Sequence, residues 1–205
     1  MDLDALTNAI SATVPGSTTK LVAIDGRGGA GKSSLACELA DRLDNATVVA
    51  VDDFWLPLSS RPDRDTVISQ PGSDYDWHRL RDQVIQPLAE GRSGRYQRYD
   101  WRDDKLAEWH YVPAGGATIV EGVFSIREEL RDLYDIRVWV ETPAAICLAR
   151  GLERDGEGAR DLWKNEWMRA YEQYIVATDP SSYANYILSG ARVEGHVDGQ
   201  QDRLF

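Results

Sequence analysis

The residues with the clearest chemistry form the run GRGGAGKS, from Gly26 to Ser33. This run matches the P-loop pattern G-x-x-x-x-G-K-[ST], in which glycines let the backbone wrap a phosphate with its N–H groups pointing inward. The ammonium of Lys32 would reach the β- and γ-phosphates, and the hydroxyl of Ser33 would bind Mg²⁺. The run therefore predicts a site for ATP and Mg²⁺. The residues expected to hold the nucleotide here are Gly26, Gly28, Gly29, Ala30, Gly31, Lys32, Ser33 and Ser34.

Carboxylates follow two other apolar runs. Asp52 and Asp53 come directly after TVVAV, and Glu121 follows ATIV. If these runs are parallel strands, their carboxyl ends lie beside the phosphate site. A carboxylate there can accept the proton of an attacking hydroxyl or hold a water of the Mg²⁺ shell. We expect Ser33, Asp52 and Glu121 around the metal ion, and Asp53 and Glu121 near the substrate.

Three arginines, Arg150, Arg154 and Arg160, lie in the segment ARGLERDGEGAR together with two glycines. Guanidinium groups stabilise the charge of a transferring phosphoryl group, and a lid that closes over the site excludes water. We therefore predict a small helical lid over residues 150–162. Arg150 and Arg154 are expected at the nucleotide, Arg154 as a catalytic residue, and Arg160 at the substrate. The alternative is a charged helix surface.

Short apolar runs that alternate with helical patterns must position these residues. They predict a single three-layer α/β domain over residues 1–205, the P-loop NTPase fold, with a parallel sheet covered by helices on both faces. Residues 55–75 are expected to form a loop. The expected strands span 21–25, 47–51, 117–122, 136–141 and 186–188. The expected helices span 2–13, 32–43, 76–90, 143–150 and 161–177.

The composition argues against several classes of protein. The formal net charge of −11 over 205 residues disfavours a nucleic-acid or anionic-membrane surface. No apolar run approaches the ~20 residues of a membrane span, and the N-terminus lacks a signal-peptide pattern. Cys37 and Cys147 match no metal-ligand spacing, so we expect reduced core cysteines of a cytoplasmic protein. His78 and His196 stand in no motif and are expected at the surface.

Two aromatic groups allow alternative interpretations. Trp163, Trp167, Tyr171 and Tyr174 recur at helical spacing, which is more typical of packing than of ligand stacking. The run RYQRYDW (95–101) interleaves aromatic and basic residues, as a single-stranded nucleic-acid platform does. Because the chain is acidic and the run is short, a hairpin that walls the acceptor pocket is the better interpretation.

The ordered set of motifs resembles the P-loop kinase family of uridine kinase, phosphoribulokinase and bacterial pantothenate kinase. The resemblance covers about residues 20–190. It implies that Asp52 is the catalytic base, that Asp76 and Tyr99 contact the phosphoryl acceptor, and that the three arginines cover the phosphates. The motifs that carry it are GRGGAGKS, VDDFW (51–55), YDW (75–77), YDW (99–101), IVEG (119–122) and ARGLERDGEGAR (149–160).

The sequence also departs from uridine kinases. The histidine that helps those enzymes read the pyrimidine is missing after Tyr99, because Arg102 to Lys105 follow and His110 lies too far along. We therefore predict a Mg-ATP-dependent kinase for a hydroxyl of a small metabolite, most like uridine kinase, with Asp52 and Lys32 as further catalytic residues. A kinase for pantothenate or a sugar, and a non-catalytic ATP-sensing module, remain alternatives.

Overall fold

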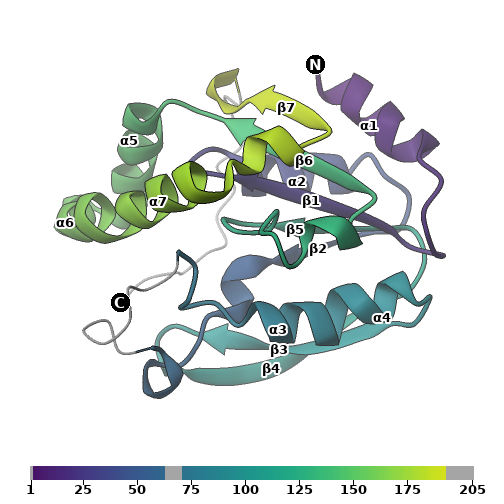
Figure 1. Ribbon diagram of the computed structural model, residues 1–205, viewed down its shortest axis with the longest axis horizontal. Helices are drawn as coiled ribbons and strands as arrows, with labels where there is room; N and C mark the ends of the chain where they lie inside the picture. Colours follow the sequence, from purple (N-terminus) through teal and green to yellow (C-terminus); the bar gives the residue numbers. More distant parts are fainter. Residues whose placement is uncertain (1, 63–70, 193–205) are drawn as a thin grey trace.

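A computed structural model describes residues 2–62 and 71–192 of the chain. Its centre is a five-stranded sheet in the order β2-β5-β1-β6-β7 (Figure 1). All neighbouring strands of this sheet run parallel, as predicted. The strands are β1 (Lys20–Gly26), β2 (Ala46–Ala50), β5 (Ala117–Glu121), β6 (Ile136–Glu141) and β7 (Tyr186–Ser189).

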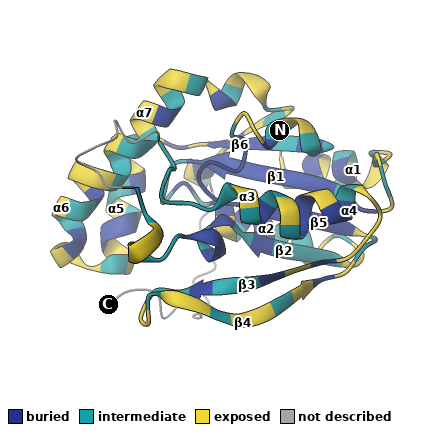
Figure 2. Ribbon diagram, turned by 60° about the horizontal axis from the view of Figure 1, so that its bottom comes forward, coloured by how far each residue is buried: buried dark blue, intermediate teal, exposed yellow. Residues whose placement is uncertain are grey.

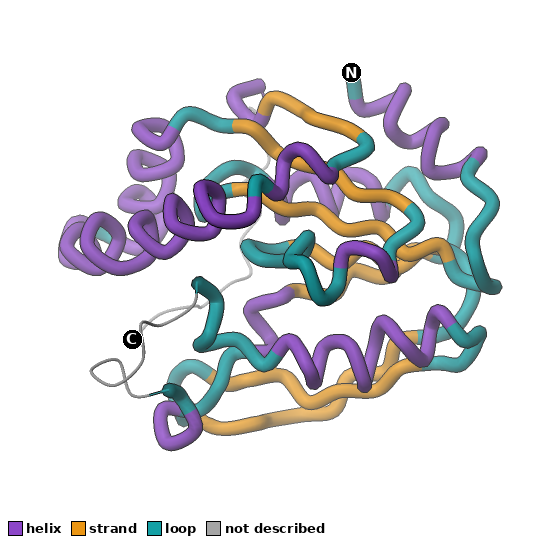
Figure 3. Tube along the Cα trace, viewed as in Figure 1, coloured by secondary structure: helices purple, strands orange, loops and turns teal. Residues whose placement is uncertain are grey.

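Helices cover both faces of the sheet, so the predicted three-layer α/β architecture is confirmed (Figure 3). The predicted helix over 76–90 is a continuous helical run with a π-type stretch, and so is the run that begins at Arg160. The α- and π-helical elements of the described residues are α1 (Leu3–Ala12), α2 (Lys32–Ala40), α3 (Trp77–Leu80), η3 (Arg81–Ile85), α4 (Gln86–Ala89), α5 (Ala144–Asp155), α6 (Arg160–Leu162), η6 (Trp163–Trp167) and α7 (Met168–Thr178).

The two faces of the sheet carry separate apolar cores because side chains alternate along each strand. On β1, Leu21 and Ala23 belong to the core that includes helix residues such as Leu80. Val22 and Ile24 belong to the core formed with α1 and α2. All five residues from Leu21 to Asp25 are buried, as expected of a central parallel strand (Figure 2).

A two-stranded antiparallel hairpin lies outside the sheet. It pairs β3 (Gly94–Asp100) with β4 (Lys105–Val112), which confirms the predicted hairpin (Figure 1). Tyr96 and Tyr99 on β3 are buried, whereas Trp109 and Tyr111 on β4 are exposed. The inner strand therefore joins the core next to the end of β2, and β4 forms an outer surface.

Several local predictions need correction. Strand β2 ends at Ala50, because Val51–Phe54 form a 3-10 turn, η1. Helix α5 runs on to Asp155 instead of ending near 150, and Pro143 is its N-cap. Cys147 is buried as predicted, but Cys37 is exposed because it lies on the outer side of α2.

Other predictions concern the surface. His78 is exposed as expected, and His196 lies outside the described residues. In the part of the chain that the structure describes, none of the helices has the length and apolar character to span a bilayer.

Candidate active site

The P-loop lies between β1 and α2, where the sequence places it. Gly29 and Gly31 have φ angles of 76° and 100°, a backbone region that only glycine enters at little cost. A Cβ atom on Gly29 would also lie 2.4 Å from the carbonyl oxygen of Cys147. The loop thus needs these glycines, and it presents the N-terminus of a nine-residue helix, a geometry that suits phosphate binding.

Lys32 and Ser33 begin α2 and point to different partners. The buried Lys32 ammonium donates a hydrogen bond to the carbonyl oxygen of Arg27 at 2.9 Å, across the loop. The Ser33 hydroxyl donates to Oε1 of the buried Glu121 at 3.1 Å. Because β5 lies next to β1 in parallel, Glu121 reaches the mouth of the P-loop. Hydroxyl and carboxylate oxygens are ligands that Mg²⁺ accepts, so the pair fits a metal ion shared with nucleotide phosphates.

Asp52 lies on η1, just past the end of β2, and is half-buried. Its Oδ1 accepts a hydrogen bond from the Tyr75 hydroxyl at 3.3 Å. Burial raises the pKa of Tyr75, and the nearby Asp52 carboxylate raises it further. Tyr75 therefore stays a hydrogen-bond donor at neutral pH and orients Asp52 in the crevice.

Asp53 points towards the hairpin instead. It is buried, and its Oδ2 accepts a hydrogen bond of 2.8 Å from the Tyr96 hydroxyl on β3. Arg79 donates to the backbone carbonyl of Asp53 at 3.1 Å. These contacts fix the η1 turn to the hairpin, and the contact of Asp53 with substrate stays a prediction.

Asp76 is the N-cap of α3, and its Oδ1 accepts from the backbone N–H of Arg79 at 3.0 Å. Its own N–H donates to the carbonyl oxygen of Phe54 at 2.7 Å, which places it beside η1. Sequence reasoning missed Arg79, which also lies 3.7 Å from Asp76 Oδ2 and over the ring of Phe54. Burial lowers the pKa of Arg79. The sequence signal that could have identified Arg79 is its position three residues after Asp76, the aspartate that caps α3.

Tyr99 is buried on β3, and its hydroxyl donates to Asp104 Oδ1 at 2.6 Å. Burial and this hydrogen bond raise the pKa of Tyr99 to about 12. Arg61 donates to the same hydroxyl at 3.1 Å and lies over the ring of Trp55. Tyr99 therefore belongs to a polar network with Arg61 and Asp104, neither of which the sequence motifs had indicated.

Arg154 lies at the end of α5 and pairs with its neighbour Asp155, with nitrogen–oxygen distances of 2.7 and 3.0 Å. Asp155 also accepts a hydrogen bond from Trp163 Nε1 at 2.9 Å, and the side chain of Asp155 is completely buried. Hydrogen bonding to Asp155 raises the pKa of Arg154, and the charge of Asp52 contributes in the same direction.

The other two arginines of the predicted lid have different surroundings. Arg150 donates to the carbonyl oxygen of Gly190, after β7, at 3.0 Å. Arg160 pairs with Glu157 at 2.7 Å at the partly exposed start of α6. The segment 150–162 forms the end of α5, a short turn and α6, which project beyond the edge of the sheet (Figure 1).

Asp25 is a buried carboxylate directly before the P-loop that the sequence motifs did not single out. It accepts hydrogen bonds from the backbone N–H groups of Gly26, Phe124 and Ile126 at 2.7 to 3.2 Å. Tyr174 donates its hydroxyl to Asp25 at 2.8 Å. Burial raises the pKa of Asp25, and these hydrogen bonds oppose the shift. The sequence signal that could have identified Asp25 is a charged residue within an otherwise apolar strand.

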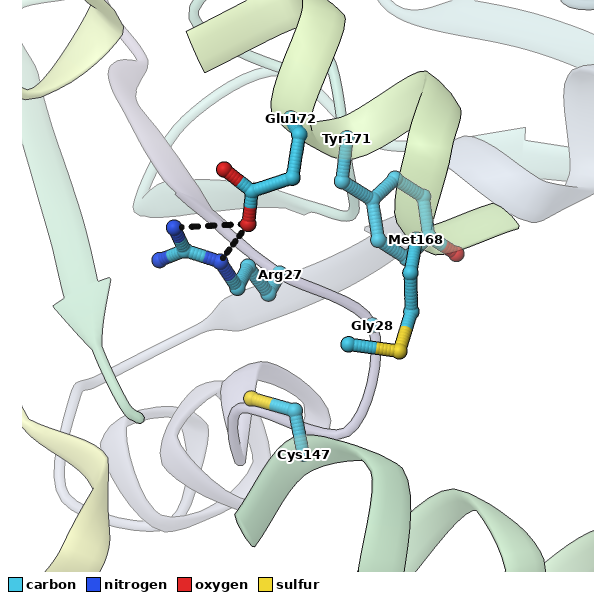
Figure 4. Close-up of a pocket in the computed structure, with 6 residues that line it drawn as sticks. All are labelled: Arg27, Gly28, Cys147, Met168, Tyr171 and Glu172. Atoms are coloured by element: carbon cyan, nitrogen blue, oxygen red, sulfur yellow. Dashed lines mark hydrogen bonds and ion pairs between the residues drawn. The ribbon is translucent and has the colours of Figure 1, made fainter. Parts of the chain in front are cut away.

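Helix α7 also contacts the P-loop. Arg27 pairs with Glu172 at 3.0 Å and with Glu141 at 3.6 Å. Figure 4 shows Tyr171 and Glu172 of α7 pointing towards the loop, with Cys147 of α5 on the other side. The residues that line this small pocket are Arg27, Gly28, Cys147, Met168, Tyr171 and Glu172.

Comparisons with known proteins agree with this geometry. A sequence profile described as the Phosphoribulokinase / Uridine kinase family matches residues 21–189. A uridine kinase of Halobacterium salinarum is 30% identical over 169 residues, which cover 77% of this chain and 75% of the relative.

The chain belongs to the phosphoribulokinase and uridine kinase family. Its members are P-loop kinases of small molecules, so the chain is an enzyme of this class.

Solved structures show the same fold. A structure reported as a possible uridine kinase from Bacillus stearothermophilus has a TM-score of 0.69 and 20% identity, covering 91% of this chain and 96% of that one. A D-glycerate 3-kinase from Cryptococcus neoformans has a TM-score of 0.56 and 14% identity, covering 93% of each chain. Kinases with unlike acceptors share this fold, so the fold alone does not choose the acceptor.

Proposed function

We propose that this family member transfers the γ-phosphoryl group of Mg-ATP to a hydroxyl group of a nucleoside, with uridine as the first candidate. The observation that carries the proposal is the placement of Asp52. Its carboxylate is held by Tyr75 at the end of β2, and Lys32 and Ser33 begin the helix of the neighbouring P-loop. A base and a phosphate cradle at one edge of a parallel sheet suit transfer to a hydroxyl.

Each residue has a role in this proposal. The backbone of Gly28 to Ser34 and the Lys32 ammonium bind the phosphates, and Ser33 and Glu121 hold Mg²⁺, directly or through water. Asp52 Oδ accepts the proton of the acceptor hydroxyl and can also face the metal ion. Arg154 exchanges its contact with Asp155 for the phosphoryl oxygens, and Arg150 and Arg160 support the lid. Mg-ATP supplies the phosphoryl group.

The acceptor would lie beside η1, on the side of Asp76 and Tyr99. Trp55 packs there against Tyr75 and Trp101, with ring centroids 4.2 and 4.9 Å apart. Such an aromatic wall suits a flat ring, and this favours a nucleoside over an open-chain acceptor. A kinase for another acceptor, such as pantothenate or a sugar, keeps the same Asp52 chemistry.

Coupled ADP release across nucleosides, vitamins and sugars tests the proposal. We expect ADP formation to rise strongly with a nucleoside and little with the other compounds. Stimulation by a sugar or a vitamin alone would replace the proposed acceptor. ATP binding without stimulation by any compound would instead support an ATP-sensing module.

Asp76→Ala is expected to raise the acceptor KM at least about tenfold while the ATP Kd changes little, because Asp76 lies on the acceptor side of η1. The variant also loses a helix cap worth about 1 kcal/mol, so Asp76→Asn, which keeps a capping oxygen, separates the two effects. Asp82→Ala, an exposed carboxylate of the same helical run, is the control. Weakened ATP binding with unchanged acceptor KM would show that the two sites are reversed.

A further inference from the structure

Gly28 is a glycine that the P-loop pattern does not require, because the pattern leaves its position open. Its backbone does not require glycine either, since Gly28 is not among the glycines with positive φ. The reason lies in another element. A Cβ atom on Gly28 would be 2.7 Å from both Oη and Cε2 of Tyr171. Gly28 thus forms a notch in the P-loop that admits the ring of Tyr171.

The ring of Tyr171 enters this notch from α7 (Figure 4). It is half-buried and lies edge-on to Phe124, with the ring centroids 6.4 Å apart. Burial raises the pKa of Tyr171, and the Asp52 carboxylate raises it further. Its hydroxyl, which lies against Gly28 of the P-loop, therefore remains a hydrogen-bond donor at neutral pH.

Two anchors on the same helix fix this position. Glu172, the next residue, pairs with Arg27 at 3.0 Å. One turn later, Tyr174 donates to Asp25, which itself accepts from the N–H of Gly26. The helix is thus tied by two contacts to the residues that directly precede the notch. Tyr171 is therefore held against the P-loop, which is the proposed phosphate site, although helical spacing favoured packing over ligand stacking for this residue.

We propose that Tyr171 is a residue of the phosphoryl-transfer site, whose hydroxyl donates a hydrogen bond to the transferred phosphoryl group while its ring closes the Gly28 notch against water. This inference rests on the proposed function. It adds to Lys32 and Arg154 a neutral donor on α7, supplied from outside the motifs of the P-loop and the lid. Preorganised donors of this kind stabilise charge that develops during transfer.

Tyr171→Phe tests the hydroxyl because it removes one oxygen and keeps the ring. We expect kcat to fall about 10²-fold, the effect typical of one lost donor, while the ATP Kd measured by calorimetry stays within about threefold. Tyr134→Phe is the control, because Tyr134 is buried and its hydroxyl has no hydrogen-bond partner. A Tyr171→Phe enzyme with the kcat of wild type would overturn the inference and leave the proposed function intact.

A second measurement needs no turnover. Gly28→Ala should lower the melting temperature of the nucleotide-free protein by several degrees, because the added methyl group overlaps the Tyr171 ring. In a Tyr171→Ala background the same change should cost little, so the double-mutant cycle should show coupling. If Gly28→Ala lowers the melting temperature equally in both backgrounds, the ring does not occupy the notch and the inference fails. The two measurements can also disagree: the cycle can show coupling while wild-type protein forms no ADP in response to any acceptor. That result would refute the proposed function and the hydrogen bond to the phosphoryl group. The contact between Tyr171 and Gly28 would stand.

Discussion

Lys32→Ala is expected to lower kcat by about three orders of magnitude or more. Lys32 is buried, and its ammonium crosses the P-loop to the carbonyl oxygen of Arg27, where it would meet the β- and γ-phosphates. An alanine removes this charge from a site with little access to water, where a positive charge is worth most. The measurement is steady-state ADP release with saturating acceptor.

The control for this variant is Lys105→Ala. Lys105 lies on the hairpin, its side chain is 62% exposed, and it pairs with Asp103. We expect it to keep the kcat of wild type. Turnover by Lys32→Ala close to that of Lys105→Ala would contradict the assignment of the P-loop as the nucleotide site.

Asp52→Asn should bind Mg-ATP normally and lose most of its kcat. Asparagine keeps the size of the side chain and can still accept from Tyr75, but it cannot take up the proton of the acceptor. Loss of a general base typically costs roughly 10²- to 10⁴-fold, and a loose transition state needs the proton late, so about 10²-fold to 10³-fold is expected. The measurements are kcat and, by calorimetry, the Kd of Mg-ATP.

Asp53→Asn is the matched variant, since it changes the neighbouring carboxylate in the same way. Asp53 is buried and bonded to Tyr96, so the substitution weakens one buried hydrogen bond and costs about 1–2 kcal/mol of stability. We expect it to keep most of its kcat. If Asp53→Asn loses activity while Asp52→Asn retains it, the two residues have exchanged roles.

Much of the fold could be predicted because its signals are local. Each buried strand is a short apolar run, and the glycines of the P-loop mark the turn into α2. The strand order β2-β5-β1-β6-β7 was not predicted, because the strands that pair lie far apart in the sequence. The hairpin was predicted from the run RYQRYDW (95–101), in which aromatic and basic residues interleave.

The site was harder to predict in detail. The residue at which β2 ends decides which carboxylate faces the P-loop, and the strand ends one residue earlier than its apolar pattern suggests. Helical spacing predicted that the aromatic residues of η6 and α7 pack inward, and Trp163 of η6 and Tyr174 of α7 are buried. Spacing could not show that Tyr171 meets a glycine of the P-loop, because that contact depends on how α7 crosses the loop.

Transfer of labelled phosphate tests the central claim most directly. Wild-type protein and Asp52→Asn are incubated with Mg²⁺, ATP labelled at the γ-phosphate, and uridine, and the labelled products are separated. The account predicts labelled nucleoside monophosphate with wild type and about 10²-fold to 10³-fold slower formation with the variant. Label that appears only as inorganic phosphate with wild type, or that reaches uridine equally fast with both proteins, would contradict it.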